Sequence, residues 1–295
     1  MKTPDHTTSR RRFLRQGALA GGSLLFLADH ARGAAEPATD ATNATLDTIH
    51  RARTTHGNFT AQEIPEDVLQ KIIHASLRAP GASNLQNYSI IVVRERDRMK
   101  HLCGYAGSRA LVYCIDYNRL TATAEHLGHA YKPYGLDSLL IGCVNTTLAI
   151  QNATLAARSL GVDYLVTNGV HRGDMTRVWK TLDLPESLCF PLAAVVLGYP
   201  TEEPKHQRGR LSGPGVVHEN TYHRLTQVEL DALVAQHDDP AQNLPLSDEW
   251  KKSGHKHYLD WLFTAWLGRG APPAGQESQV TRLLKRSGFV AAAPS

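Results

Sequence analysis

Residues Ala79–Tyr88 read Ala-Pro-Gly-Ala-Ser-Asn-Leu-Gln-Asn-Tyr and join an amphipathic helical pattern to the β-branched run Ile90–Val93. Such a run is typical of a buried strand. Small side chains let backbone N–H groups approach a ligand closely, and the amides of Asn84 and Gln86 can each donate and accept hydrogen bonds. The same residue types also form ordinary turns. The meaning of this loop therefore depends on what the chain places around it.

Hydrophobic periodicity on both sides of the loop predicts a single domain of mixed helices and strands. The helices are expected over residues 46–53, 64–79, 94–103, 136–160, 171–182, 226–237 and 246–267, and the strands over 90–93, 110–115, 162–166 and 191–197. The pattern over 136–160 is apolar through much of the helix circumference, so this helix must be buried against the core or against another subunit.

The N-terminus has the parts of an export signal. Arg10, Arg11 and Arg12 precede Phe13-Leu14, a short apolar segment follows, and Gly33-Ala34-Ala35 is a small-residue cleavage site. The paired arginines resemble a twin-arginine signal, which is read by a receptor and does not anchor the chain. We therefore expect a periplasmic or otherwise exported protein; the alternative is a basic tail beside a short helix.

Charge argues against a nucleic-acid partner. Residues 1–35 contain six basic and two acidic residues, which accounts for the whole formal net charge of +4. The remainder is neutral, and a neutral body gives no reason to expect nucleic-acid binding. Residues 36–45 are rich in Ala, Pro and Thr and are expected to form a flexible lead-in, with the domain over 46–270 and a tail over 271–295.

The cysteines and histidines do not predict a metal centre. None of the four cysteines forms a Cys-x-x-Cys pair, and Cys143 and Cys189 lie in apolar runs typical of a core. A disulfide between Cys103 and Cys114 is neither required nor excluded in an oxidising compartment. Glu125, His126 and His129 do not have metalloprotease spacing, and a solvated helix face is the better interpretation.

Four separated polar clusters suggest a ligand with a charged end and a flat polar ring. They are Arg51/Arg53 with Thr54/Thr55, Asn84/Gln86, Asn168/Gly169 and Arg208/Arg210. Two arginine pairs suit an anionic group such as a phosphate, held by charge-assisted hydrogen bonds. The sequence has no glycine-rich phosphate loop, so side chains would have to hold that phosphate.

From about Leu46 to Tyr222 the chain resembles the nitroreductase family of FMN-dependent oxidoreductases. The resemblance rests on motifs in the family's order: the run Arg53–Phe59, the loop Ala79–Tyr88, the helix end Ala156–Val162, Gly198–Pro200 and Arg208–Arg210. It implies an α+β fold in which helices flank a central, mostly antiparallel sheet. It also implies an obligate homodimer with a flavin at the subunit interface, wrapped by C-terminal helices that could equally pack within their own chain.

Carried over to this chain, the resemblance gives the polar clusters roles. Arg53 and Thr55, beside Arg51 and Thr54, would contact the phosphate and ribityl chain of FMN, and Arg208 and Arg210 would hold the phosphate. Asn84 and Gln86 would lie at the isoalloxazine edge, and Asn168 and Gly169 near flavin N5. Gly57 stands where many members have a basic residue, Asn87-Tyr88 replaces Pro-Trp, and Asn168 replaces an acid. The Asn87-Tyr88 departure suggests a difference in substrate.

The expected activity passes electrons or a hydride through flavin N5 to a small acceptor such as a nitroaromatic or quinone, with ping-pong kinetics. The electron donor would be NAD(P)H or, outside the cytoplasm, a membrane or periplasmic redox partner. An alternative is an exported flavin-binding module that relays electrons or stores flavin without fast turnover. A third, weaker possibility is a scaffold for another exported enzyme.

Overall fold

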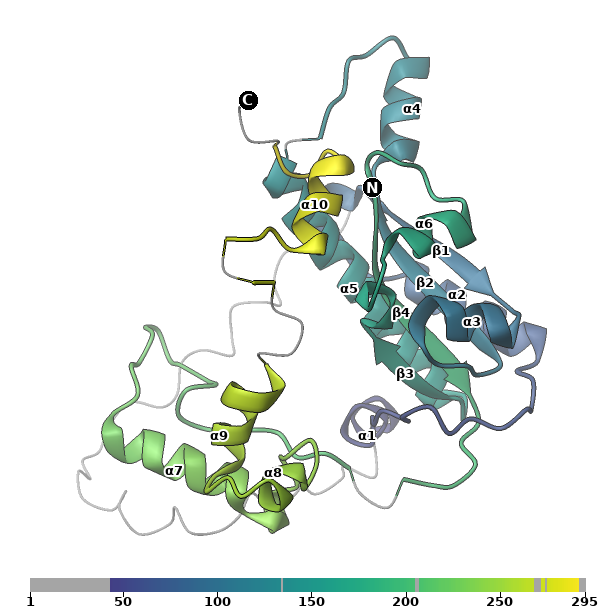
Figure 1. The fold of residues 1–295 in the computed structure, drawn as a ribbon. Helices are drawn as coiled ribbons and strands as arrows, with labels where there is room; N and C mark the ends of the chain where they lie inside the picture. Colours follow the sequence, from purple (N-terminus) through teal and green to yellow (C-terminus); the bar gives the residue numbers. More distant parts are fainter. Residues whose placement is uncertain (1–42, 134, 205–206, 268–271, 274, 292–295) are drawn as a thin grey trace, which may run out of the picture. The chain divides into compact units, whose positions relative to one another are not determined.

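The sheet at the centre of the fold has four strands, all paired antiparallel in the order β1-β2-β4-β3 (Figure 1). The strands are β1 (Tyr88–Val93), β2 (Arg109–Asp116), β3 (Asp163–Thr167) and β4 (Cys189–Gly198). In this computed structural model we describe residues 43–133, 135–204, 207–267, 272–273 and 275–291. The expected signal over 1–35 and most of the lead-in lie outside these ranges.

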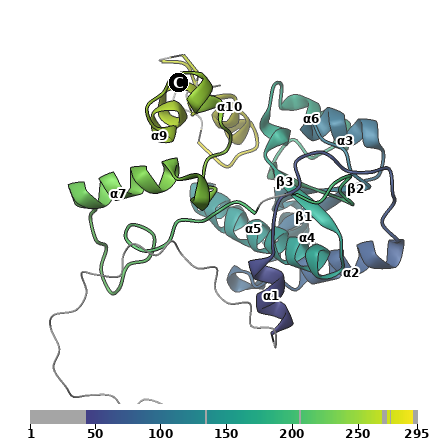
Figure 2. The same ribbon diagram turned by 90° about the horizontal axis from the view of Figure 1, so that it is seen from below.

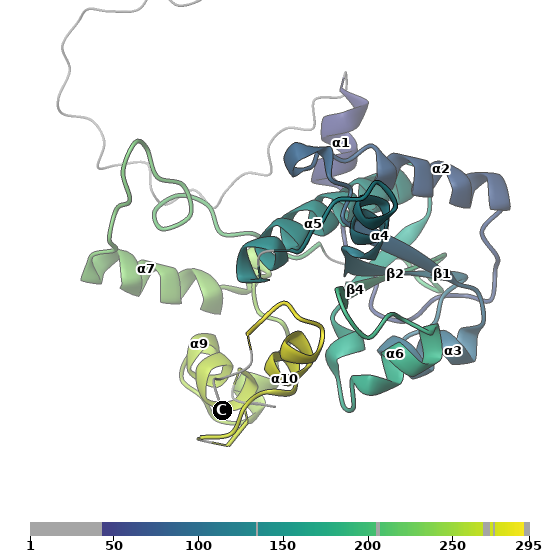
Figure 3. The ribbon, with the colours of Figure 1, turned by 90° about the horizontal axis from the view of Figure 1, so that it is seen from above.

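Helices cover both faces of the sheet, as Figures 2 and 3 show. On one face α5 (Gly135–Ser159) contacts every strand and packs along α2 (Glu66–Leu77). On the other face α3 (Arg96–Cys103) contacts β2 and α6 (Thr176–Leu182). The shorter helices near the N-terminal half are α1 (Ala44–His50) and α4 (Asn118–His126). The expected α+β fold with a flanked antiparallel sheet is therefore confirmed.

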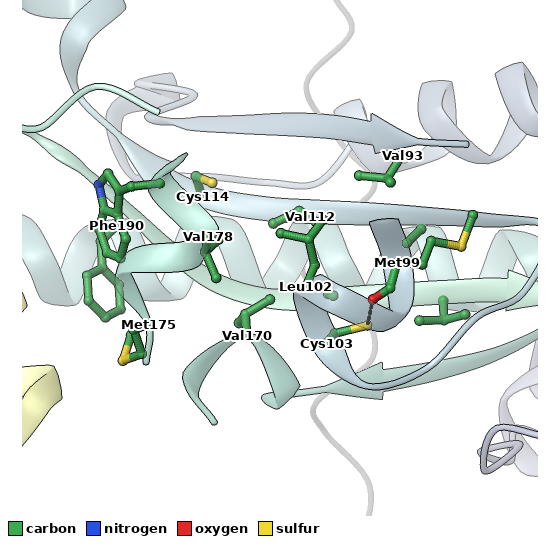
Figure 4. Packing of buried hydrophobic residues seen from close by; sticks show 14 of the residues in the cluster. Val93, Met99, Leu102, Cys103, Val112, Cys114, Val170, Met175, Val178 and Phe190 are labelled. Atoms are coloured by element: carbon green, nitrogen blue, oxygen red, sulfur yellow. Dashed lines mark hydrogen bonds between the residues drawn. The ribbon is translucent and has the colours of Figure 1, made fainter. Parts of the chain in front are cut away.

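The two faces bury separate clusters because successive strand residues point to opposite sides. Leu111 and Val195 join the cluster under α2 and α5, whereas Val112 and Val196 join the cluster under α3 and α6. Figure 4 shows the second cluster, in which the Cys103 thiol donates to the Met99 carbonyl at 3.3 Å. All four cysteines are free thiols, so the disulfide left open between Cys103 and Cys114 does not form.

The long helix α5 is both a core helix and an exposed apolar surface. It is the one helix in the described ranges that could cross a membrane by length and composition, but it packs on the sheet through Ala149, Ala153 and Ala157. Its outer face carries a stripe with a spacing of four, which we call the α5 stripe: Leu136, Leu140, Val144 and Leu148, 56%, 63%, 57% and 37% exposed. Residues four apart lie on one face of a helix.

The C-terminal quarter differs most from expectation. The helix expected over 226–237 is α7 (Gln227–Asp238). The helix expected over 246–267 is instead broken into α8 (Glu249–Lys252), α9 (Tyr258–Trp261) and a π-helical turn over Leu262–Trp266. Gly254 explains the break, since its φ of +74° belongs to the left-handed region and cannot continue a right-handed helix.

The stretch 271–295 is not a mere tail. Its described part contains α10 (Gln279–Arg286). Leu283 and the following Phe289 are 5% and 0% exposed and belong to the cluster under α3 and α6. Because both side chains are buried with residues of the central sheet, this segment completes the core. The earlier domain boundary at residue 270 was wrong in this respect.

Candidate functional site

Backbone pairing brings the first and last polar clusters of the sequence together. Thr60 N donates to Tyr199 O and Thr201 N donates to Asn58 O, both at 2.8 Å, so the chain after β4 runs antiparallel to residues 58–60. Farther along, the Gln207 amide donates to the carbonyls of His50 and Ala52 at 2.6 and 2.8 Å. These contacts hold the loop after β4 against the segment that follows α1.

The two segments enclose a pocket of about 480 Å³, which we call the arginine pocket. It is lined by Ala52, Arg53, Thr54, Thr55, His56, Asn58, Glu202, Glu203, Pro204, Gln207, Arg208 and Arg210. The pocket therefore unites Arg53, Thr54 and Thr55 with Arg208 and Arg210, as an anion site built from side chains requires. Glu202 and Glu203, which sequence reasoning missed, add negative charge to its wall.

Arg53 is held from two sides by acids. Its Nη2 donates to Asp163 Oδ2 at 3.1 Å and also to Glu203. Partial burial disfavours the charge, but the hydrogen bonds to these two carboxylates outweigh it and raise the pKa of Arg53 above its ordinary value. Arg53 Nε is buried without a hydrogen-bond partner among the described residues. The guanidinium thus stays charged, and its Nε–H donor is uncommitted.

Arg208 and Arg210 have different surroundings. The Arg208 guanidinium donates to Asn243 Oδ1, Pro245 O and Leu246 O at 3.1, 2.5 and 3.0 Å. Arg210 donates only to backbone carbonyls of its own turn and forms no ion pair within the described ranges. Arg208 therefore anchors the segment before α8, and Arg210 is the freer cation of the pair.

Gly209 lets this loop pack closely. A Cβ at this position would lie 1.9 Å from the Gln242 carbonyl oxygen, closer than real Cβ contacts come. Gly209 N donates to Asn243 O at 3.2 Å, and Asn243 Nδ2 donates to Gln207 O at 2.6 Å. Glycine is thus required for the Arg-Gly-Arg turn to rest on residues 242–243.

Arg51, Asn168 and Gly169 do not line the arginine pocket. Arg51 pairs with Asp47 at 2.7 Å on α1 and is 64% exposed. Asn168 and Gly169 follow β3, whereas Asp163 begins it, and a rise of about 3.3 Å per residue places these ends roughly 15 Å apart. Gly169 N donates to Thr167 Oγ1 at 3.0 Å, and a Cβ on Gly169 would lie 2.0 Å from Cys103 O.

Asn84 and Gln86 also lie away from the arginine pocket. They precede β1, which is one edge of the sheet, whereas β3 is the other edge. Strand spacings of about 4.8 Å put these edges on the order of 14 Å apart. Asn84 and Gln86 have left-handed φ values of +51° and +49°, and Arg119 donates to Gln86 O. Within one chain this loop and the arginines form separate surfaces.

A buried amide pair anchors the Ala79–Tyr88 loop to α5. Asn145 Oδ1 accepts from Ala82 N at 2.9 Å, and Asn145 Nδ2 donates to Asn87 Oδ1 at 2.6 Å. Asn87 and Tyr88 are 0% and 6% exposed. Asn87 therefore acts on the anchorage of the loop, whereas Tyr88 lines a separate pocket of about 490 Å³ together with Gln86 and Arg119.

Comparisons with known proteins identify the family of this chain. The sequence profile of the nitroreductase family matches residues 50–113. The chain is 32% identical over 193 residues to the FMN reductase [NAD(P)H] of Bacillus subtilis, covering 62% of this chain and 75% of that protein. It is 34% identical over 191 residues to the NADPH-flavin oxidoreductase of Vibrio harveyi, with 62% and 76% covered. The chain belongs to the nitroreductase family.

Solved structures agree with the nitroreductase fold. The chain is similar to the NADPH:FMN oxidoreductase from Vibrio harveyi complexed with NAD+, with a TM-score of 0.65 and 26% identity over 84% of this chain and 99% of that one. The family motifs in the sequence did not identify the acidic residues that contact Arg53. Asp163 and Glu203 lie 110 and 150 residues from Arg53, and no local pattern links them.

Proposed function

We propose that this nitroreductase-family protein is an FMN-dependent oxidoreductase that transfers electrons from a nicotinamide or other redox donor to a small acceptor. One observation carries the proposal: the arginine pocket joins Arg53 and Thr55 to Arg208 and Arg210. The unpartnered buried Nε of Arg53 and the freer guanidinium of Arg210 fit a dianionic phosphate.

The residues of the pocket would divide the work of holding FMN. Arg53 and Arg210 would donate to the phosphate, and the hydroxyl of Thr54 would donate to the phosphate or ribityl oxygens. The Thr55 hydroxyl donates its one proton to Asp163 at 2.8 Å, so it can only accept a hydrogen bond from a ligand. Asn168 and Gly169, at the far end of β3, would lie toward the ring. Bound FMN would supply the redox chemistry, with donor and acceptor reacting in alternate half-reactions, while the protein supplies binding and orientation.

A homodimer would complete this site. The α5 stripe exposes Leu136, Leu140, Val144 and Leu148 along one helix face, and an apolar stripe of this length is typical of a protein interface. Asn84 and Gln86 occupy the sheet edge opposite the arginine pocket of their own chain. In the proposed dimer the partner's loop, carrying these amides, would contact the ring of the flavin.

Donor and acceptor are open to a direct test. Purified protein is expected to be yellow, to lose its flavin absorbance under anaerobic NADPH or NADH, and to regain it with a nitroaromatic, a quinone or free FMN. A panel of acceptors ranks the substrates, since the names of the relatives favour flavin itself and the family name favours nitroaromatics. Slow reduction by every donor would favour the electron-relay or flavin-storage alternative. Protein that takes up no FMN would overturn the proposal.

We also propose export through the twin-arginine pathway. The support is the order of Arg10, Arg11, Phe13 and Leu14 before an apolar segment and a small-residue site. Outside the cytoplasm NAD(P)H is scarce, so a membrane quinol or a periplasmic redox protein would then serve as the donor. The rate of reduction of the holoprotein by a quinol analogue, compared with the rate by NADPH, distinguishes the two kinds of electron donor.

A further inference from the structure

Asp163 lies behind the arginine pocket and connects two of its side chains, Arg53 and Thr55, to Arg158 of α5. Its Oδ2 accepts from Arg53 Nη2 at 3.1 Å and from Thr55 Oγ1 at 2.8 Å. Its Oδ1 accepts from Arg158 Nη1, at the end of α5, at 2.6 Å. Asp163 is 3% exposed and does not itself line the pocket. Apart from the field of its charge, any effect on a ligand must therefore pass through its partners.

Burying a carboxylate is costly unless charged and hydrogen-bonding partners compensate. Two guanidinium groups and one hydroxyl meet that need here, and they come from two parts of the chain, the segment 53–55 and the end of α5. Thr55 N also donates to the carbonyl of the next residue, Tyr164, at 2.9 Å. The start of β3 thus holds both the backbone and the side chain of Thr55, and it fixes the side chain of Arg53.

Arg53 has a second acidic partner of a different kind. Glu203 lines the pocket and its side chain is 76% exposed, whereas the Asp163 side chain is 3% exposed. An incoming anion can displace an exposed carboxylate, which regains its hydration in water. A buried carboxylate cannot move into water and regain its hydration in this way. Arg53 can therefore exchange Glu203 for a ligand while Asp163 keeps it in place.

We propose that Asp163 is a positioning residue for the FMN phosphate, holding the Arg53 guanidinium in the orientation that receives it. This inference rests on the proposed function. It makes a prediction opposite to that of simple electrostatics. Removing a negative charge near a phosphate would by itself tighten FMN binding, whereas losing the orientation of the Arg53 donors would weaken it.

The test measures dissociation constants of FMN and riboflavin by flavin fluorescence for apoprotein of wild type, Asp163→Asn and Asp163→Glu. Riboflavin has the same ring system and no phosphate. We expect Asp163→Asn to raise the FMN dissociation constant about tenfold or more, as for a charged hydrogen bond lost, and to leave that of riboflavin nearly unchanged. The charge-conserving Asp163→Glu should show the same phosphate-specific loss, because its carboxylate is displaced by one methylene.

A double-mutant cycle with Arg53→Ala tests whether Asp163 acts through Arg53. If Asp163 acts through Arg53, adding Asp163→Asn to Arg53→Ala should weaken FMN binding less than it does in wild type. Unchanged or tighter FMN binding in both Asp163 variants would overturn the inference, as would an equal loss for FMN and riboflavin. Wild-type protein that binds neither flavin would instead refute the proposed function itself. Should Asp163→Asn fail to fold, as judged by circular dichroism, Asp163→Glu decides the question.

Discussion

Arg208 Nη1 donates a 3.1 Å hydrogen bond to Asn243 Oδ1, and the same guanidinium reaches the carbonyls of Pro245 and Leu246. This contact ties the loop after β4 to the segment before α8. A residue chosen from its motif as a phosphate ligand therefore has a structural task as well. Arg208 and its neighbour Arg210 should respond differently to substitution.

Arg208→Ala should lower the free energy of unfolding. Three hydrogen bonds from a charged donor are lost, and we expect a decrease of about 1.5–3 kcal/mol. Urea unfolding monitored by fluorescence of the tryptophans measures it, with Arg210→Ala as the matched control that should change stability less. Equal stability of the two variants would contradict the anchoring role.

Arg210→Ala should weaken FMN binding strongly. Loss of one charged hydrogen bond to the phosphate costs about 1.5–3 kcal/mol, or roughly 10- to 150-fold in the dissociation constant. Titration of apoprotein with FMN measures the change. Arg94→Ala serves as a control, because Arg94 pairs with Glu66 at 3.0 Å and does not line the pocket. An unchanged affinity in Arg210→Ala would show that the phosphate is held elsewhere.

Leu140→Lys should dissociate the proposed homodimer. A buried lysine in the α5 stripe would have to lose its hydration or separate the subunits. The control is Leu127→Lys, because Leu127 and Leu140 are both 63% exposed but only Leu140 belongs to the stripe. Size-exclusion chromatography with light scattering should show a monomer for Leu140→Lys alone, with reduced flavin content. A dimer in both variants would place the interface elsewhere.

The precursor should remain inside the cell when Arg10→Lys and Arg11→Lys are combined, since the twin-arginine receptor reads the pair. Fractionation followed by immunoblotting distinguishes precursor from processed protein. The control is Lys2→Arg, which keeps the leader basic outside the motif. Normal export of the double variant would refute the proposed route.

Stability should fall as the solution is acidified through pH 6.5, in part because of His171. Burial lowers the pKa of His171 below 6.5, while its Nε2 lies 2.8 Å from Pro191 O. The unfolded chain then binds more protons than the native state just below pH 6.5, so acidification favours unfolding in that window. Urea midpoints at pH 7.5 and 5.5 should differ less for His171→Gln than for wild type. An identical pH dependence would show that His171 does not contribute.

Much of the architecture could be read from local patterns. The β-branched run after Ala79–Tyr88 is β1, the apolar run ending at Gly198 is β4, and the long apolar pattern is α5. Each depends on residues that are neighbours in sequence, so spacing alone identifies it. The family motifs were readable for the same reason, because each spans only a few residues.

The two errors had different causes, one local and one that depends on distant contacts. Residues 246–267 have a helical composition, yet Gly254 and the cluster of Trp250, Tyr258 and Trp261 divide them into short helices. The segment around Leu283 and Phe289 looked like a tail, because the core it completes is built from α3, α6 and the sheet.

By itself the sequence determined the order of the strands and of the helices up to α7, the arginine pairs and the family to which they belong. Only the tertiary structure decided which arginine faces what: Arg53 meets Asp163, Arg208 meets Asn243 and Arg210 forms no ion pair within the described ranges. The physical reason is that charge and hydrogen-bonding capacity are properties of a residue. Their partners lie 35 and 110 residues away along the chain, and only folding brings them to 3.1 Å.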